Sequence, residues 1–155
     1  MEIIRADINT YEKIFESLSA LDKLCVGADG WSAESFKSEV AKDNGIVMYT
    51  VENGSITGLI CGFFAADEAE ITSVAVSPQH RRKGIAARLM DGYFSTLPES
   101  VRSIFLEVRE SNSAAIGLYE KFGFEKISVR KNFYSFPDEN AVVMQKSLNK
   151  EGSEC

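Results

Sequence analysis

The arrangement of apolar residues changes near Pro78, and this change constrains the fold more than any other feature of the sequence. Upstream, residues 46–76 carry three short apolar segments separated by turn residues, which predicts consecutive antiparallel strands. Downstream, predicted helices and strands alternate: helix 84–97, strand 101–108, helix 113–122, and strands 124–133 and 140–148. Antiparallel hairpins followed by strand–helix–strand crossovers place one parallel pair among antiparallel neighbours. The sequence therefore predicts an α/β fold with a mixed sheet.

Local signals predict the turns and helix ends of the N-terminal half. After a first short strand, apolar residues recur at helical spacing over 11–25, and Asn9 is predicted to cap this helix. Ser32 is predicted to cap a second helix. Asn53-Gly54 predicts a hairpin turn, and the following segment, 56–65, is apolar on both faces, as in a central strand.

Composition excludes several classes of protein. The 155 residues suit one domain, which we expect to span 1–149, with a flexible tail at 150–155. We expect no membrane segment, because no apolar run approaches ~18 residues. We expect no secretory signal, because the N-terminus lacks a basic start followed by an apolar centre. Three scattered cysteines and a single histidine predict neither a metal site nor a Cys–His relay. The net charge of −6 disfavours direct nucleic-acid binding. The few scattered cysteines favour the cytoplasm, and we expect a monomer or weak dimer.

One segment has the character of an anion-binding site. A strand ending at Val76 leads through the basic residues Arg81, Arg82 and Lys83 to a helix that opens at Gly84. The first turn of a helix presents unpaired backbone N–H groups and the positive end of the helix dipole, to which phosphates bind readily. On charge and glycine alone, the segment fits either a phosphate site or an ordinary helix start.

Two motifs in this part of the chain resemble a known family. Arg81-x-x-Gly84-x-Ala86 resembles the Arg/Gln-x-x-Gly-x-Gly/Ala loop with which the GNAT N-acetyltransferase superfamily binds the pyrophosphate of acetyl-CoA. A second run is similar to the bacterial ribosomal-protein-alanine N-terminal acetyltransferases of that superfamily: Leu106-Glu107-Val108-Arg109-x-Ser111-Asn112, then Leu118-Tyr119 and Gly123-Phe124. The resemblance covers about residues 1–148 and is strongest over 70–148. It includes Trp31-Ser32, although Gly30 stands where relatives often have proline.

The resemblance implies a fold and a cofactor site. The fold is a mixed, mostly antiparallel sheet of about seven strands, with a central splayed parallel pair and about four helices. Acetyl-CoA would be a substrate and no metal would be needed. Backbone groups of Val74, Ala75 and Val76 would pair with the pantetheine arm, and the Val76 N–H would polarise the thioester carbonyl. Asn112 would lie near the thiol end. The pyrophosphate would be held by Arg81, Arg82, Lys83, Gly84, Ile85, Ala86 and Ala87.

The resemblance also assigns the acid–base roles. Glu107 would accept the proton of the attacking ammonium, and Tyr119 would return a proton to the departing thiolate. The segment before Trp31 would form the acceptor-binding loop. Asp138 and Glu139, at the tip of the last hairpin, would border the same site, where they could face a basic substrate.

The acceptor implied by the resemblance is the N-terminal amine of a protein, most of all the alanine of a ribosomal protein. Chemistry favours an α-amine, because at a pKa of ~7.7–8.0 roughly a tenth is neutral at pH 7, against about one part in 10³–10⁴ for lysine. Two alternatives remain open from the sequence. One is a GNAT enzyme acting on a small-molecule amine or a lysine side chain, and the other is a non-catalytic acyl-CoA-binding module.

Overall fold

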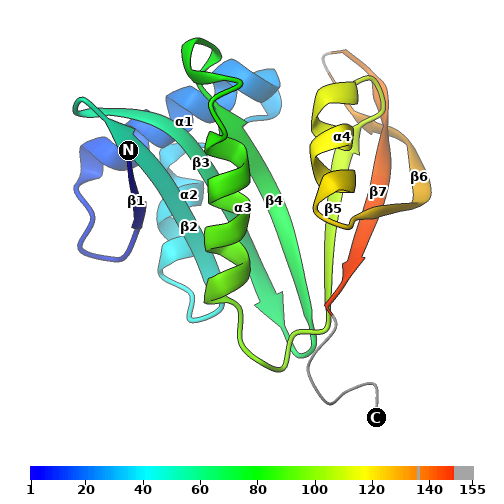
Figure 1. The fold of residues 1–155 in the computed structure, drawn as a ribbon. Helices are drawn as coiled ribbons and strands as arrows, with labels where there is room; N and C mark the ends of the chain where they lie inside the picture. The colour runs from blue at the N-terminus through cyan, green and yellow to red at the C-terminus, as the bar shows by residue number, and fades with distance from the viewer. Residues whose placement is uncertain (136, 149–155) are drawn as a thin grey trace. The chain divides into compact units, whose positions relative to one another are not determined.

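The computed structural model describes residues 1–135 and 137–148, so the expected tail at 150–155 lies outside the described residues. Seven strands in this part of the chain form one sheet in the order β1-β2-β3-β4-β5-β7-β6 (Figure 1). The strands are β1 (Glu2–Arg5), β2 (Gly45–Glu52), β3 (Ser55–Ala65), β4 (Glu68–Val76), β5 (Ser103–Arg109), β6 (Glu125–Tyr134) and β7 (Glu139–Ser147). The helices are α1 (Glu12–Val26), α2 (Ala33–Val40), α3 (Ile85–Thr96) and α4 (Ser113–Lys121), with short 3-10 turns η1 (Gly27–Asp29) and η2 (Pro78–His80).

This architecture confirms the predicted mixed sheet. β4 and β5 are parallel, and their pairing runs from Glu68–Ser103 to Ile71–Leu106. The pairs β1–β2, β2–β3, β5–β7 and β6–β7 are antiparallel. The chain divides into two compact units, one formed by Met1–Phe63 with Thr72–Thr96, the other by Phe64–Ile71 with the described residues from Leu97 onward.

The first unit packs helices on both faces of β2 and β3. One face carries Val47, Tyr49, Leu59 and Cys61, which belong to a buried cluster with Phe15 and Leu18 of α1 and Phe36 of α2. On the other face, a Cβ atom at Gly58 would lie 2.8 Å from the Ile85 side chain, so α3 approaches the strand backbone closely. Figure 1 shows α3 on the opposite side of these strands from α1 and α2. The central, two-sided strand predicted at 56–65 is confirmed.

The second unit is built around β5, β7 and α4. Ile104, Leu106 and Val108 of β5 are buried, whereas the residues between them are half-buried. Asn112 caps α4 by accepting a hydrogen bond from the Ala115 N–H at 3.1 Å. Gly123 follows the helix with a φ of +93°, as expected for a glycine that ends a helix. No helix in the described ranges is both long and apolar enough to cross a membrane.

Two predicted turn features of the first unit are confirmed, and one helix cap is wrong. Asn53 and Gly54 have φ of 53° and 79°, the left-handed pair that a two-residue hairpin loop needs. Ser32 caps α2, since its Oγ accepts from the Ser35 N–H at 3.1 Å. Asn9 does not cap α1, which begins after Tyr11 without a side-chain cap. Instead, Asp7 accepts from the Asn9 N–H, and the residues before α1 form a separate turn.

Candidate active site

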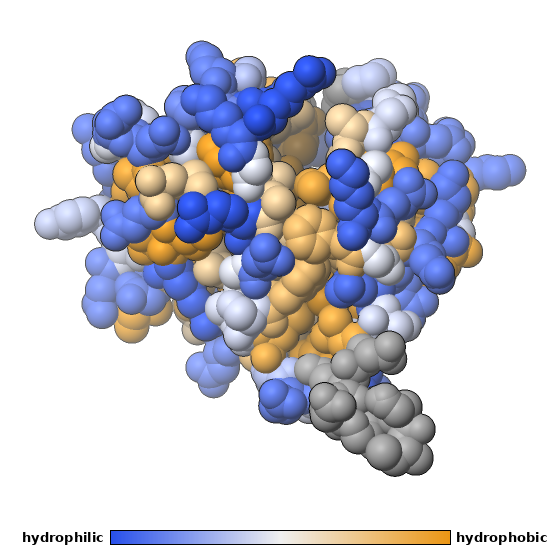
Figure 2. Space-filling view, in the orientation of Figure 1, coloured by the Kyte–Doolittle hydropathy of each residue, from blue (hydrophilic) through white to orange (hydrophobic). Residues whose placement is uncertain are grey.

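The segment between β4 and α3 presents backbone donors outward, as an anion site requires. In the described residues, the first backbone hydrogen bond of α3 runs from the Arg88 N–H to the Gly84 oxygen, so the preceding amide groups are left without a helical partner. Arg82 and Gly84 adopt φ of 66° and 79°, which turns the chain sharply into the helix. The first turn carries no acidic residue, and hydrophilic side chains cover this end of the unit in Figure 2. These residues fit a pyrophosphate.

Arg81 is held by contacts with two neighbouring elements. Its Nε donates to the Val76 oxygen at 3.1 Å, and Nη2 lies 3.6 Å from the Cys25 Sγ. The guanidinium is therefore attached to the end of β4 and the end of α1. Arg81, Arg82 and Lys83 are all exposed, so all three add positive charge at the helix start, Arg81 from a position fixed by these contacts.

The three strand residues predicted to bind the pantetheine arm form the end of β4. Ala75 is buried, and Val74 and Val76 are half-buried. The Val76 oxygen accepts from Arg81 and also from the Cys25 thiol at 3.5 Å. This carbonyl is therefore already used within the protein, whereas the role predicted for Val76 towards a thioester belongs to its N–H.

Glu107 belongs to a three-residue charged cluster in the second unit. Its Oε2 accepts from Arg130 Nε of β6 at 2.9 Å. Glu70 of β4 lies close enough to interact with both; burial raises the pKa of Glu70, the Glu107 carboxylate raises it further, and Arg130 lowers it. Sequence reasoning missed Arg130 and Glu70, because only the sheet order brings these residues of β4, β5 and β6 together.

Tyr119 is suited to hold a proton. The residue is only 7% exposed, and its ring packs edge-on against Phe124 with centroids 5.9 Å apart. Burial raises the pKa of the phenol well above its ordinary range, with a smaller contribution from Tyr134. No hydrogen bond joins Tyr119 to Glu107 in the described part of the chain. Asn112 reaches neither residue by a hydrogen bond and uses its side-chain oxygen as the α4 cap.

The tip of the β6–β7 hairpin is held by contacts of Arg109 and Glu139 that the sequence did not predict. Arg109 donates to the Ser135 and Pro137 oxygens and to Glu139 Oε1, and its guanidinium lies 4.5 Å from the Tyr134 ring centroid. Glu139 Oε2 accepts from the Ser111 N–H at 2.6 Å. These contacts with Ser111 and Arg109 lower the pKa of Glu139. Glu139 is therefore engaged within the protein, and Asp138 is the exposed acid of the tip.

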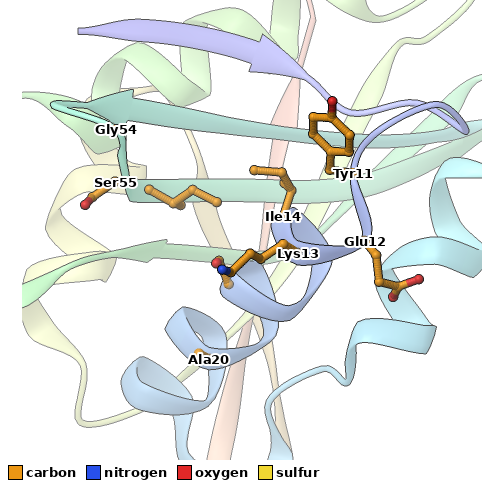
Figure 3. A pocket seen from close by; sticks show the side chains of 9 residues that line it. Tyr11, Glu12, Lys13, Ile14, Ala20, Gly54 and Ser55 are labelled. Atoms are coloured by element: carbon orange, nitrogen blue, oxygen red, sulfur yellow. The ribbon is translucent and has the colours of Figure 1, made fainter.

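A separate surface hollow is lined by residues of the first unit. It has a volume of about 790 Å³ and is formed by the start of α1 and the β2–β3 turn. Figure 3 shows Tyr11 and Ile14 on one side and Gly54-Ser55 on the other. None of the residues predicted to bind acetyl-CoA or to transfer protons lines it, and no group of His, Cys, Asp or Glu in the described residues is arranged to hold a metal.

Comparison with known proteins identifies the family. The sequence model of the Acetyltransferase (GNAT) family matches residues 11–124. The chain is 32% identical over 117 residues to the ribosomal protein bS18-alanine N-acetyltransferase of Escherichia coli (strain K12), covering 74% of this chain and 78% of that protein. It is 41% identical over 98 residues to the protein of the same name from Haemophilus influenzae, covering 61% and 66%.

Similarity in three dimensions extends over nearly the whole chain. The crystal structure of the ribosomal-protein-S18-alanine N-acetyltransferase from Escherichia coli superposes with a TM-score of 0.82 at 25% identity, covering 99% of each chain. The family match spans the β4–α3 segment and both β5 and α4. The chain therefore belongs to the GNAT acetyltransferase family and is an acetyl-CoA-dependent N-acetyltransferase.

Proposed function

We propose that this enzyme acetylates the N-terminal α-amine of a protein, and that the acceptor is the N-terminal alanine of a ribosomal protein. The observation that carries the proposal is the 32–41% identity to relatives that bear the name ribosomal protein bS18-alanine N-acetyltransferase. The acceptor chemistry agrees with it. An α-amine needs only a modest base, worth ~10²–10⁴-fold, because roughly a tenth of it is already neutral at pH 7.

The cofactor side of the proposal rests on the β4–α3 segment. Backbone N–H groups from Arg82 to Ala87 hold the pyrophosphate at the start of α3, and Arg82 and Lys83 neutralise its charge. Val74, Ala75 and Val76 line the pantetheine arm, and the Val76 N–H donates to the thioester oxygen. Acetyl-CoA supplies the carbonyl carbon that the amine attacks. The reaction forms one N–C bond and breaks one C–S bond.

Two side chains of the second unit move the protons. Glu107 accepts a proton from the ammonium, directly or through one water, while Arg130 orients its carboxylate. Tyr119 gives a proton to the departing thiolate. Burial raises the pKa of this phenol, so Tyr119 is protonated before the reaction and has a proton to give. Asn112 contributes through the position of the first turn of α4, which it caps.

The test is a thiol-release assay with acetyl-CoA and matched peptides. The peptides share one sequence and begin with Ala, Ser or Met, and a fourth has a blocked N-terminus and an internal lysine. We expect release with the Ala peptide, less with Ser and Met, and none with the blocked peptide. Mass spectrometry then locates the acetyl group.

Other outcomes assign other acceptors. Release only with the blocked lysine peptide, or only with small amines such as polyamines, would contradict an N-terminal acceptor. Acetylation of the Ala peptide but of no ribosomal protein with an N-terminal alanine would contradict the proposed natural substrate while leaving the chemistry intact.

A further inference from the structure

The loop between α1 and α2 is held by two hydrogen bonds, which involve the backbone N–H and the backbone oxygen of Trp31. The Trp31 N–H donates to Asp22 Oδ2 at 2.7 Å, and the Trp31 oxygen accepts from Ser19 Oγ at 2.7 Å. Both partners belong to α1 and are buried, Asp22 at 1% exposure and Ser19 at 8%. Loops on protein surfaces usually leave such groups to water. This loop is instead fixed to a rigid helix.

Asp22 also connects the same loop to β4. Its second oxygen, Oδ1, accepts from Ser73 Oγ at 2.5 Å, and Ser73 directly precedes the three residues proposed to line the pantetheine arm. One turn further along α1, the Cys25 thiol donates to the Val76 oxygen. The last part of α1 is therefore attached to the end of β4 at two points. The loop that follows α1 lies beside the strand on which the thioester would rest.

The close contact of the loop with α1 also accounts for Gly30. Its φ of −63° is one that any residue can adopt. A Cβ atom at this position would nevertheless lie 2.7 Å from the Lys23 Cα and 2.8 Å from the Lys23 nitrogen. Backbone atoms cannot move aside cheaply, so alanine or proline here would displace the loop. Glycine at position 30 therefore has a steric reason in this chain.

We infer that Asp22 is a positioning residue for the acceptor substrate. Its buried carboxylate sets the place of Trp31 relative to Ser73, and so sets the distance between the acceptor loop and the strand that would hold the thioester. The inference rests on the proposed function and on the family resemblance, which implies that the loop carrying Trp31 borders the acceptor. Asp22 itself touches no reacting atom and acts through Trp31. It determines acceptor binding and leaves the site at the start of α3 unchanged.

The experiment compares Asp22→Ala and Asp22→Asn with a control variant, Thr50→Val. Thr50 is as buried as Asp22 and belongs to the same unit. Its replacement by valine removes the 2.8 Å hydrogen bond between the Thr50 and Thr57 hydroxyls. Two quantities are measured: KM for the Ala peptide and for acetyl-CoA, and acrylamide quenching of tryptophan fluorescence. Trp31 is the single tryptophan of the chain, so quenching reports on this loop alone and does not require turnover.

We expect Asp22→Ala to raise KM for the peptide at least about 10-fold and KM for acetyl-CoA less than about 2-fold. The quenching constant of Trp31 should rise about 2-fold or more. Asp22→Asn should bring the peptide KM and the quenching constant most of the way back to wild-type values. Its side-chain amide can still accept from the Trp31 N–H and donate to the Ser73 hydroxyl. Thr50→Val should lower the unfolding temperature without changing either KM or the quenching constant.

The inference is overturned if Asp22→Ala leaves peptide KM and quenching at wild-type values, or if KM for acetyl-CoA rises as much as KM for the peptide. If Asp22→Ala does not fold, Ser19→Ala and Ser73→Ala each remove one link of the same network, and wild-type behaviour of both would overturn it equally. A wild-type enzyme that acetylates no N-terminal peptide contradicts the proposed function instead. The quenching comparison then decides the role of Asp22.

Discussion

At the scale of single residues, the charged cluster around Glu107 decides how a carboxylate on a strand can serve as a base. Arg130 fixes the direction of the Glu107 carboxylate. Glu70 shares the neighbourhood, and its pKa is raised by burial first and by Glu107 second. Two acids with different environments so close together are a common arrangement in acid–base sites. Their separate substitution can therefore tell which of the two takes the proton.

We predict that Glu107→Gln and Tyr119→Phe each lower kcat at least ~10-fold with little change in KM for acetyl-CoA. Both changes keep the size of the side chain and remove only the titrating group. Glu70→Gln is the matched control and should keep kcat within about 3-fold. Steady-state thiol release measures all three. A large loss in Glu70→Gln with near-normal Glu107→Gln would move the base to Glu70.

The resemblance to a family suggested Glu107 and Tyr119 from the sequence, but not what surrounds them. Arg130 of β6 reaches Glu107 of β5 across the strand between them, β7. No local pattern in the sequence encodes this strand order. Asp22 was not singled out from the sequence, which predicted only a helix over 11–25. Its role depends on Trp31 and Ser73, which the fold brings to it. Partners that are distant in sequence were thus the part that could not be predicted.

At the scale of elements, the turns that follow local rules were predictable. Asn53-Gly54 and Ser32 each act within a few residues of their own position, and the structure places both as expected. The prediction that Asn9 caps α1 was wrong, also for a local reason. Asp7 offers nearby backbone groups a competing carboxylate, so the chain turns once more before α1 begins.

The element that carries the cofactor proposal can be tested at Gly84. Its φ of 79° strains any L-residue, although a Cβ atom there would meet nothing within 4 Å. We predict that Gly84→Ala lowers the free energy of unfolding by about 1 kcal/mol. Because strain shifts the amide groups at the start of α3, affinity for acetyl-CoA should fall roughly 3- to 10-fold.

Gly117→Ala provides the control for this element, since Gly117 lies inside α4 and a Cβ atom there also meets nothing within 4 Å. This change should raise the free energy of unfolding by roughly 0.5–1 kcal/mol. Urea unfolding and calorimetric titration with acetyl-CoA measure both effects. Unchanged acetyl-CoA binding by a strained Gly84→Ala protein would place the pyrophosphate away from this helix start.

At the scale of the whole molecule, charge is distributed unevenly. The chain carries 23 acidic and 17 basic residues, for a net charge of −6. Arg81, Arg82, Lys83 and Arg88 nevertheless gather around the start of α3. A local basic segment suits the phosphates of acetyl-CoA, whereas the acidic remainder favours an acceptor of positive charge. The phosphates of acetyl-CoA are negative, and an N-terminal ammonium is positive until it loses its proton.

We therefore predict that basic residues after the N-terminal alanine increase kcat/KM. At low ionic strength, an Ala peptide followed by lysines or arginines should exceed a neutral peptide of equal length by about 10-fold, and an acidic one should fall below it. Since the Debye length shortens from about 30 Å at 0.01 M to about 3 Å at 1 M salt, the difference should shrink steadily as sodium chloride is added. Equal kcat/KM for the three peptides at every salt concentration would mean that the net charge serves solubility alone. A preference for the basic peptide that persists at high salt would instead indicate direct pairing with individual acids near the acceptor loop, such as Glu34, which is exposed in α2.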